Sequence, residues 1–251
     1  MASHSAIEWT DATWNPVTGC SKVSPGCAHC YAETFAERFR GTPGHPYERG
    51  FDPQLWPKRL NLPLTWRQPR RIFVNSMSDL FHEDILVEFI QQIFAVMQQC
   101  HWHQFQILTK RHERLASLAA SLPWPENVWM GVSIENRRWV HRADYLRQVP
   151  SAVRFISAEP LLGRLEGLDL TGIDWLIAGG ESGAKHRPMK IEWVRELRDR
   201  CLAEGVAFFF KQWGGRYSKQ GGRVLDDQQW SQLPTADPGR GPSERTKVLA
   251  S

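Results

Sequence analysis

Three cysteines near the amino terminus have the residue type and the spacing to bind a metal centre. Cys20, Cys27 and Cys30 form the pattern Cys-x6-Cys-x2-Cys. Thiolates this close in sequence can hold a soft metal such as iron or zinc. Structural zinc sites and most iron–sulfur sites use four protein ligands. With one ligand fewer, the metal would keep an open position at which a small molecule could bind and react.

The cysteine count, the lengths of the apolar runs and the amino terminus indicate the compartment. The chain has five cysteines, an odd number with three clustered, which favours metal binding in a reducing cytosol over a disulfide framework. No stretch of about 18 apolar residues could span a membrane. Residues 1–5 lack the basic and apolar regions of a signal peptide. We therefore expect a cytoplasmic protein with no membrane partner.

The chain is mildly basic and rich in tryptophan. Its formal net charge is +4, its pI is near 8.9, and it contains 12 Trp residues. Basic surfaces attract anionic partners, and Trp beside Arg or Lys can stack on nucleic-acid bases. Most Trp residues in globular proteins nevertheless pack in or around the core. These features are compatible with a nucleic-acid partner and do not establish one.

Short apolar runs alternate with helical patterns along the chain, as in parallel βαβ units. Several runs are almost continuously apolar, which is typical of strands buried on both faces. We therefore predict an α/β fold, a partial (β/α) barrel of about six or seven parallel strands, with no helix at 161–172. The predicted strands are 12–18, 72–76, 104–109, 128–134, 153–157, 175–178 and 207–211, and the predicted helices are 31–39, 84–99, 112–121, 137–147 and 191–204.

Two segments have the composition of peripheral regions. Residues 41–70 are rich in Pro, Gly and basic side chains and are predicted to be an inserted loop region, such as a lid over the site. Residues 216–251 are predicted to be a carboxyl-terminal extension, with a mobile tail from 235. The barrel itself is expected to occupy 1–215.

Polar residues follow the predicted strands, at the ends where a parallel barrel places its active site. Ser, Asn and Asp also cap helices, and Gly makes turns. Independent helix caps do not explain why three glutamates, Glu135, Glu159 and Glu181, follow strands that end at the same edge of the barrel. They also do not explain Asp79 and Lys110, whose opposite charges suit a zwitterionic ligand. The candidates are Ser76, Ser78, Asp79, Lys110, Ser133, Glu135, Glu159 and Glu181.

The cysteine pattern, followed by Tyr31 and a predicted helix, resembles the cluster loop of the radical S-adenosylmethionine (SAM) superfamily. The wider run 7–33 is similar to a small phage-associated and bacterial family of unsettled function, and this resemblance extends to about Gly215. Members of that family are similar in turn to spore photoproduct lyase, a DNA repair enzyme of the same superfamily.

The chain also departs from the superfamily pattern. Its first cysteine gap is six residues where three is commonest, and His29 stands where an aromatic residue is usual. The superfamily's Gly-Gly-Glu after the second strand is replaced by Ser76-Met77-Ser78-Asp79. A different polar set would therefore hold the methionine amine.

The resemblance implies a cofactor and a reaction. The three cysteines would hold a 4Fe–4S cluster, whose fourth iron binds the amino and carboxylate groups of SAM. An electron from a flavodoxin- or ferredoxin-type partner would lead to cleavage of SAM and a 5′-deoxyadenosyl radical that abstracts hydrogen from the substrate. DNA or a nucleotide is the expected substrate of this lyase or modifying enzyme, and a peptide, modified nucleoside or small metabolite stays open.

The same resemblance suggests positions for SAM across the strand ends. Ser76, Ser78 and Asp79 would face its amine, Lys110 its carboxylate, Ser133 and Glu135 its ribose, and Glu159 or Glu181 the adenosine or the substrate. Tyr31 and Tyr217 are the candidates for hydrogen-atom donation. Cys100 and Cys201 are predicted to lie at the opposite end of the barrel, because each ends a helix that descends from the mouth.

Two alternatives compete with this interpretation. A structural zinc site would use the three cysteines with His4, His29 or His45 as the fourth ligand, although His29 lies awkwardly between two ligands. A non-catalytic nucleic-acid-binding protein would explain the charge and the Trp content.

Overall fold

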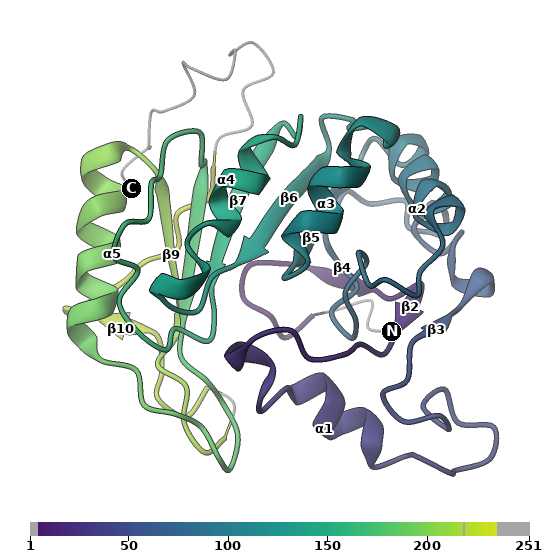
Figure 1. Cartoon of the computed structure of the whole chain (residues 1–251), viewed down its shortest axis with the longest axis horizontal. Helices are drawn as coiled ribbons and strands as arrows, with labels where there is room; N and C mark the ends of the chain where they lie inside the picture. The colour runs from purple at the N-terminus through teal and green to yellow at the C-terminus, as the bar shows by residue number, and fades with distance from the viewer. Residues whose placement is uncertain (1–4, 218, 235–251) are drawn as a thin grey trace.

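The computed structural model describes residues 5–217 and 219–234. Seven parallel strands form one sheet in the order β1-β4-β5-β6-β7-β8-β9, which curls into a half-barrel (Figure 1). This confirms the predicted partial barrel. The strands are β1 (Ala12–Trp14), β4 (Arg71–Val74), β5 (Gln104–Thr109), β6 (Val128–Ser133), β7 (Val153–Ala158), β8 (Trp175–Gly179) and β9 (Ala207–Gln212).

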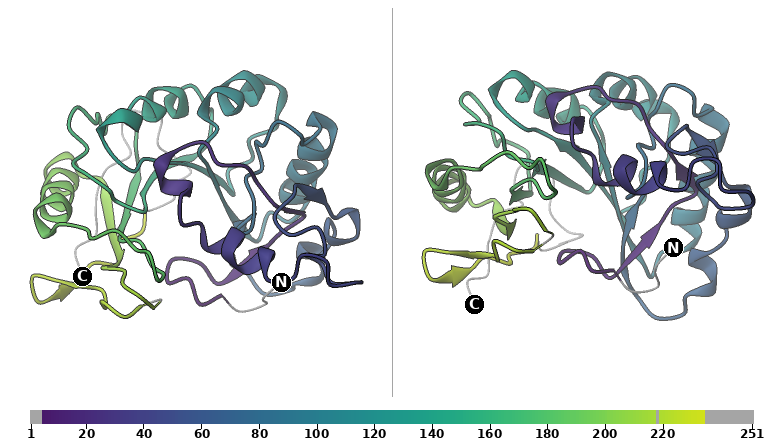
Figure 2. Two further views of the ribbon diagram at one scale, coloured as in Figure 1. Left: turned by 60° about the horizontal axis from the view of Figure 1, so that its bottom comes forward. Right: turned by 90° about the horizontal axis from the view of Figure 1, so that it is seen from below.

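Among the described residues, four helices connect successive strands. They lie on the outside of the curl, and α1 lies apart from them on the inner side (Figure 2). As predicted, no helix connects β7 to β8; that segment buries leucines such as Leu165 and Leu168 instead. None of the helices in the described residues is long and apolar enough to cross a bilayer. The helices are α1 (Tyr31–Glu37), α2 (Val87–Gln99), α3 (His112–Leu118), α4 (Arg142–Arg147) and α5 (Ile191–Glu204).

Some predicted boundaries differ from the structure. The predicted strand 12–18 breaks after Trp14, because Pro16 has no N–H to give to a ladder; β2 (Val17–Thr18) then pairs antiparallel with β3 (Gln54–Leu55). The predicted helix 137–147 is divided into a 3-10 turn, η5 (Arg137–Trp139), and α4.

The two faces of the sheet bury different side chains. The outer face packs aliphatic residues against the helices, including Ile90 and Ile93 of α2. The inner face carries an aromatic cluster that includes Trp9, Phe73 and Trp175. Period-two alternation along each strand produces this division. The aromatic cluster forms a floor beneath the carboxyl ends of the strands.

Residues after β9 fold back against its outer edge. Phe210 donates its backbone N–H to the Trp230 carbonyl at 2.9 Å, and Gln232 donates to the Phe208 carbonyl at 3.1 Å. The small hairpin of β10 (Val224–Leu225) and β11 (Gln228–Gln229) leads into this contact. The expected tail, 235–251, lies outside the described residues, as do His4 and residue 218.

Candidate functional site

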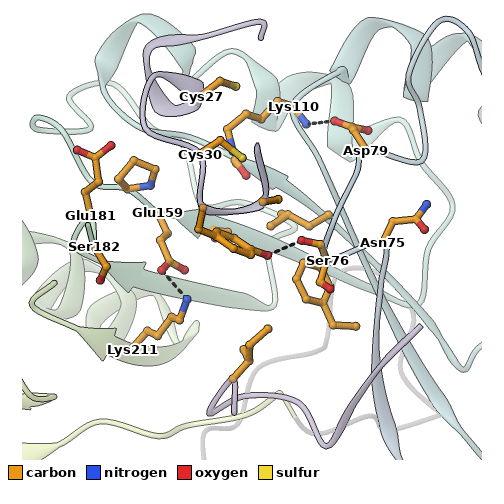
Figure 3. Close-up of a pocket in the computed structure, with 18 of the residues that line it drawn as sticks. Cys27, Cys30, Asn75, Ser76, Asp79, Lys110, Glu159, Glu181, Ser182 and Lys211 are labelled. Atoms are coloured by element: carbon orange, nitrogen blue, oxygen red, sulfur yellow. Dashed lines mark hydrogen bonds and ion pairs between the residues drawn. The ribbon is translucent and has the colours of Figure 1, made fainter. Parts of the chain in front are cut away.

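A cavity of about 480 Å³ lies at the carboxyl ends of the strands (Figure 3). Six of the seven strands contribute to its wall at or just after their last residue, and Cys20 follows β1 by six residues, so the cavity gathers side chains that are far apart in sequence. All of the predicted site residues line the cavity except Glu135 and Tyr217. In sheet order, the contributors include Cys20, Asn75, Lys110, Ser133, Glu159, Glu181 and Gln212.

The backbone of the cysteine loop (residues 20–30) brings all three thiols to the cavity. The loop begins after Gly19, whose φ of +85° and close approach to the Asp52 carbonyl leave no room for a side chain. Cys27 ends a 3-10 helix, η1 (Pro25–Cys27), and Cys30 directly precedes α1. The fold therefore places all three cysteines at one cavity.

The thiols are held in a partly desolvated setting. Burial, aided by the Asp79 carboxylate, raises the pKa of Cys20 to about 12, while the Arg111 guanidinium acts in the opposite direction. Burial also raises the pKa of Cys30, against the nearby Lys110 charge. In residues 5–217 and 219–234, no group of three or more His, Cys, Asp or Glu side chains is arranged to hold a metal ion.

Glu181, after β8, fastens the later part of the loop. Its carboxylate lies 3.1 Å from His29 Nδ1 and accepts from the Arg187 backbone N–H at 2.8 Å and from Arg187 Nε at 2.9 Å. Burial raises the pKa of Glu181, but the hydrogen bonds from Arg187 and His29 outweigh it and lower the pKa to about 2. Arg187 also donates to the Pro25 carbonyl at 3.0 Å. The loop is thus tied on both sides of Cys27.

Glu135, predicted to face a ribose, lies buried beneath the loop. Its side chain and that of Arg142 are both 0% exposed, with 3.1 Å between Arg142 Nη1 and Glu135 Oε2. The same Nη1 donates to the Ser133 carbonyl at 2.6 Å. The other carboxylate oxygen accepts from the Ser24 hydroxyl. Glu135 therefore contacts the cysteine loop and does not line the cavity.

Arg111, after β5, fastens the start of the loop. It donates to the Ser21 hydroxyl at 2.7 Å, lies 4.0 Å from Cys20 Sγ, and pairs with Glu83. The Ser21 hydroxyl also lies 2.9 Å from His82 Nε2. Sequence reasoning missed Arg111, Arg142 and Arg187; a cation following a strand end was the available signal for Arg111 alone, because the other two lie farther along the chain.

Asp79 and Lys110 are neighbours, but their functional groups differ in availability. Asp79 accepts from the Thr109 hydroxyl at 2.7 Å, the Lys110 backbone N–H at 3.0 Å and the Phe81 N–H at 3.0 Å. The Lys110 ammonium lines the cavity and forms no ion pair within the described part of the chain. It is the cation best placed to receive an anionic group beside Cys30.

The hydroxyls of Ser76 and Ser78 are committed as donors. Ser76 donates to Asn15 Oδ1 at 3.2 Å, and Ser78 donates to the Val17 carbonyl at 3.0 Å. Each oxygen retains acceptor capacity. Both residues line the cavity, so they can accept hydrogen bonds from an ammonium group.

Three buried polar atoms of cavity-lining residues have no hydrogen-bond partner among the described residues: Ser133 Oγ, Asn75 Nδ2 and Trp9 Nε1. An unsatisfied buried polar group costs roughly 1–3 kcal/mol, so each favours a polar ligand. Asn75 was not predicted. Its φ of 60°, a conformation that Asn tolerates better than most residues, is the signal at this strand end.

Glu159, after β7, and Lys211, in β9, both line the cavity and form an ion pair of 2.5 Å. Successive residues of a strand normally face opposite sides, yet Lys211 and Gln212 both line the cavity. A register shift at Ala178/Gly179 accounts for this, because Gly179 pairs with Gln212 where regular pairing would meet Lys211.

The two tyrosines and the remaining cysteines are placed differently. Tyr31 lines the cavity and its hydroxyl donates to the Ser76 carbonyl. Tyr217 is 65% exposed and lies outside the cavity wall. Cys100 and Cys201 are buried in the outer core, away from the cavity.

The histidines of the zinc alternative have other contacts. His29 lies against Glu181, and His45 stacks on Phe39 with 3.9 Å between ring centroids. Residues of the apolar floor were also missed as site residues: Trp9, Phe73 and Leu108 line the cavity. Phe73 and Leu108 occupy inward-facing positions of β4 and β5, and Trp9 lies shortly before β1. The sequence alone did not show which face of the sheet was concave.

The fold and the site define a (β/α) half-barrel with a three-cysteine loop over the carboxyl ends of its strands. The chain belongs to the family described as protein of unknown function (DUF5131), whose model matches residues 4–234. No curated protein matches the chain. It is similar to a solved structure of spore photoproduct lyase complexed with dinucleoside spore photoproduct, at 15% identity and a TM-score of 0.44. The match covers 66% of this chain and 54% of that one, so the chain corresponds to about half of the lyase's length.

Proposed function

We propose that the protein is a radical SAM enzyme. The observation that carries the proposal is that Cys20, Cys27 and Cys30 line one cavity with the ends of six of the seven strands, β4 to β9. The donor set suits a 4Fe–4S cluster, being all thiol with one ligand fewer than a closed site. The unpartnered Ser133 Oγ adds a buried polar atom that a ligand beside the cysteines could satisfy.

When bound, the cluster and SAM would supply a 5′-deoxyadenosyl radical for hydrogen abstraction. The chain's own groups bind and orient. Ser76 and Ser78 accept from the methionine amine, and Lys110 pairs with the carboxylate. Ser133 bonds the sugar hydroxyls, and the aromatic floor excludes water from the reacting end.

The substrate in this proposal is DNA or a nucleotide, and the electron comes from a flavodoxin- or ferredoxin-type partner. The net charge of +4 and the family resemblance of the cysteine run support an anionic substrate. Glu159 and Lys211, which form an ion pair on the cavity wall, would face the substrate. Tyr31 is the candidate for hydrogen-atom donation on the cavity wall, and Tyr217 is the candidate outside it.

The test is anaerobic reconstitution followed by iron and sulfide analysis, visible absorption and a SAM cleavage assay with dithionite. We expect about four irons per chain and formation of 5′-deoxyadenosine. Cys201→Ala is the matched control for Cys20→Ala, because its thiol is buried away from the cavity. Bound zinc without iron, or a loaded protein that leaves SAM intact, would overturn the proposal.

A further inference from the structure

We infer that Glu135 is a positioning residue for Cys27: its carboxylate fixes the segment Ser24–Cys27 of the cysteine loop over the end of β6. The inference concerns the geometry of the loop in the protein without any metal. Its consequence for cluster binding rests on the proposed function.

The contact between Glu135 and the loop is close on two counts. Ser24 donates its hydroxyl to Glu135 Oε1. Gly26 lies so near the same carboxylate that a Cβ there would sit 2.4 Å from Oε1. A glycine at this position therefore allows the loop backbone to rest directly on the carboxylate.

Arg142 fixes the carboxylate from below. Its Nη1 reaches Glu135 Oε2 at 3.1 Å and the Ser133 carbonyl at 2.6 Å. Its guanidinium carbon lies 4.1 Å from the centroid of the Trp139 ring. The two carboxylate oxygens therefore bind different parts of the protein, Oε2 the barrel and Oε1 the loop.

The other two cysteines have anchors of their own. Cys20 follows Gly19, which is packed against Asp52, and its neighbour Ser21 is bound by Arg111. Cys30 precedes α1 and accepts from the Thr34 N–H at 3.0 Å through its carbonyl. Loss of the Glu135 contact should consequently loosen Cys27, which keeps the ties at Pro25 and His29, and leave Cys20 in place.

The experiment measures the alkylation rate of each thiol in the metal-free protein by peptide mass spectrometry, with Cys20 as the internal reference. Ser24→Ala removes the hydrogen bond to Glu135, together with the 3.8 Å contact between the same hydroxyl and Cys27 Sγ, and leaves the buried Glu135–Arg142 pair intact. Since a hydrogen bond to a charged group is lost, we expect the Cys27/Cys20 rate ratio to rise about tenfold.

Gly26→Ala, which drives a Cβ into the carboxylate, should raise the ratio as well. Its matched control is Gly163→Ala, where the added Cβ meets only an ordinary contact at 3.4 Å from Asn136. Ser117→Ala, on the surface of α3, is the control for Ser24→Ala. Gly26→Ala keeps the Ser24 hydroxyl, which contacts Cys27 Sγ directly. A Cys27/Cys20 ratio within twofold of wild type in Gly26→Ala would therefore overturn the inference.

Reconstitution of the same variants separates this inference from the proposed function. If wild type binds a cluster, Ser24→Ala and Gly26→Ala should bind less iron than their controls at equal stability. If wild type binds none while the thiol ratio still rises in the variants, the proposed function fails and the positioning role of Glu135 stands.

Discussion

Replacing Arg142 by Met tests whether the Glu135–Arg142 pair is as desolvated as the structure shows. Met keeps most of the length and apolar volume of the Arg stem but removes the charge. Both partners are 0% exposed, so the substitution leaves an unpaired carboxylate in the core. Water cannot reach it without opening the loop above or the helix below.

The expected loss is large. Removing one partner of a buried ion pair destabilises a protein by roughly 3–5 kcal/mol. The lost contact with the Trp139 face adds up to about 2 kcal/mol when such a pair is desolvated. Taking the ion pair alone, and about 2–4 °C per kcal/mol for a chain of this size, Tm should fall by about 6–20 °C.

Urea unfolding followed by Trp fluorescence measures the free energy, with calorimetry for Tm. Arg137→Met is the matched control, because its pair with Glu166 is 3.5 Å long and 74% and 54% exposed; it should change stability by less than about 1 kcal/mol. The double variant Glu135→Gln/Arg142→Met should recover most of the loss. If Arg142→Met costs no more than Arg137→Met, the pair is solvated and the reasoning is wrong.

Three further predictions concern the site. Cys20→Ala should lose most of its iron after anaerobic reconstitution while Cys201→Ala retains it, as measured by iron analysis; equal iron in both would contradict the ligand assignment. The pKa of Glu181 is lowered from 4.5 to about 2 in the folded protein, so its carboxylate contributes stability that is present above pH 4.5 and is lost as pH falls towards 2. That contribution is about 3 kcal/mol, and Glu181→Gln should flatten the acid limb of urea-derived stability between pH 5 and pH 2 (about the two pKa values); parallel limbs would refute it. Lys110→Met should weaken SAM binding to the reconstituted protein about tenfold by loss of a charge-assisted bond, measured by equilibrium dialysis; an unchanged Kd would exclude the carboxylate contact.

Local patterns were sufficient to predict the strands of the seven-stranded sheet and the helices between them, and the edge at which the candidate residues gather. The ranges 104–109 and 191–204 agree with β5 and α5 residue for residue. In α5 the end is set by Gly205, which takes a φ of 70° as a left-handed cap. The cavity lies at the strand ends because every parallel strand delivers its following loop to the same edge.

The roles of individual side chains at that edge depended on partners that no local pattern reveals. Glu135 and Ser24 are 111 positions apart in the sequence, and His29 and Glu181 are 152 apart. Either glutamate could have faced a ligand on spacing alone. The contacts of each glutamate are determined by the cation beside it, Arg142 for Glu135 and Arg187 for Glu181, and by the cysteine loop, which folds back over the barrel.

The segment that runs back along β9 determines how far the chain can be shortened. Cutting near Gly215, where the barrel proper ends, would remove Trp230 and Gln232 and leave the β9 backbone groups that they bond without partners. An open, apolar strand edge is a template for pairing with another chain. β9 carries three consecutive phenylalanines, Phe208 to Phe210, all buried in the intact protein. Residues 219–234 therefore protect this strand edge, and a shortened form would be prone to aggregate unless it kept them.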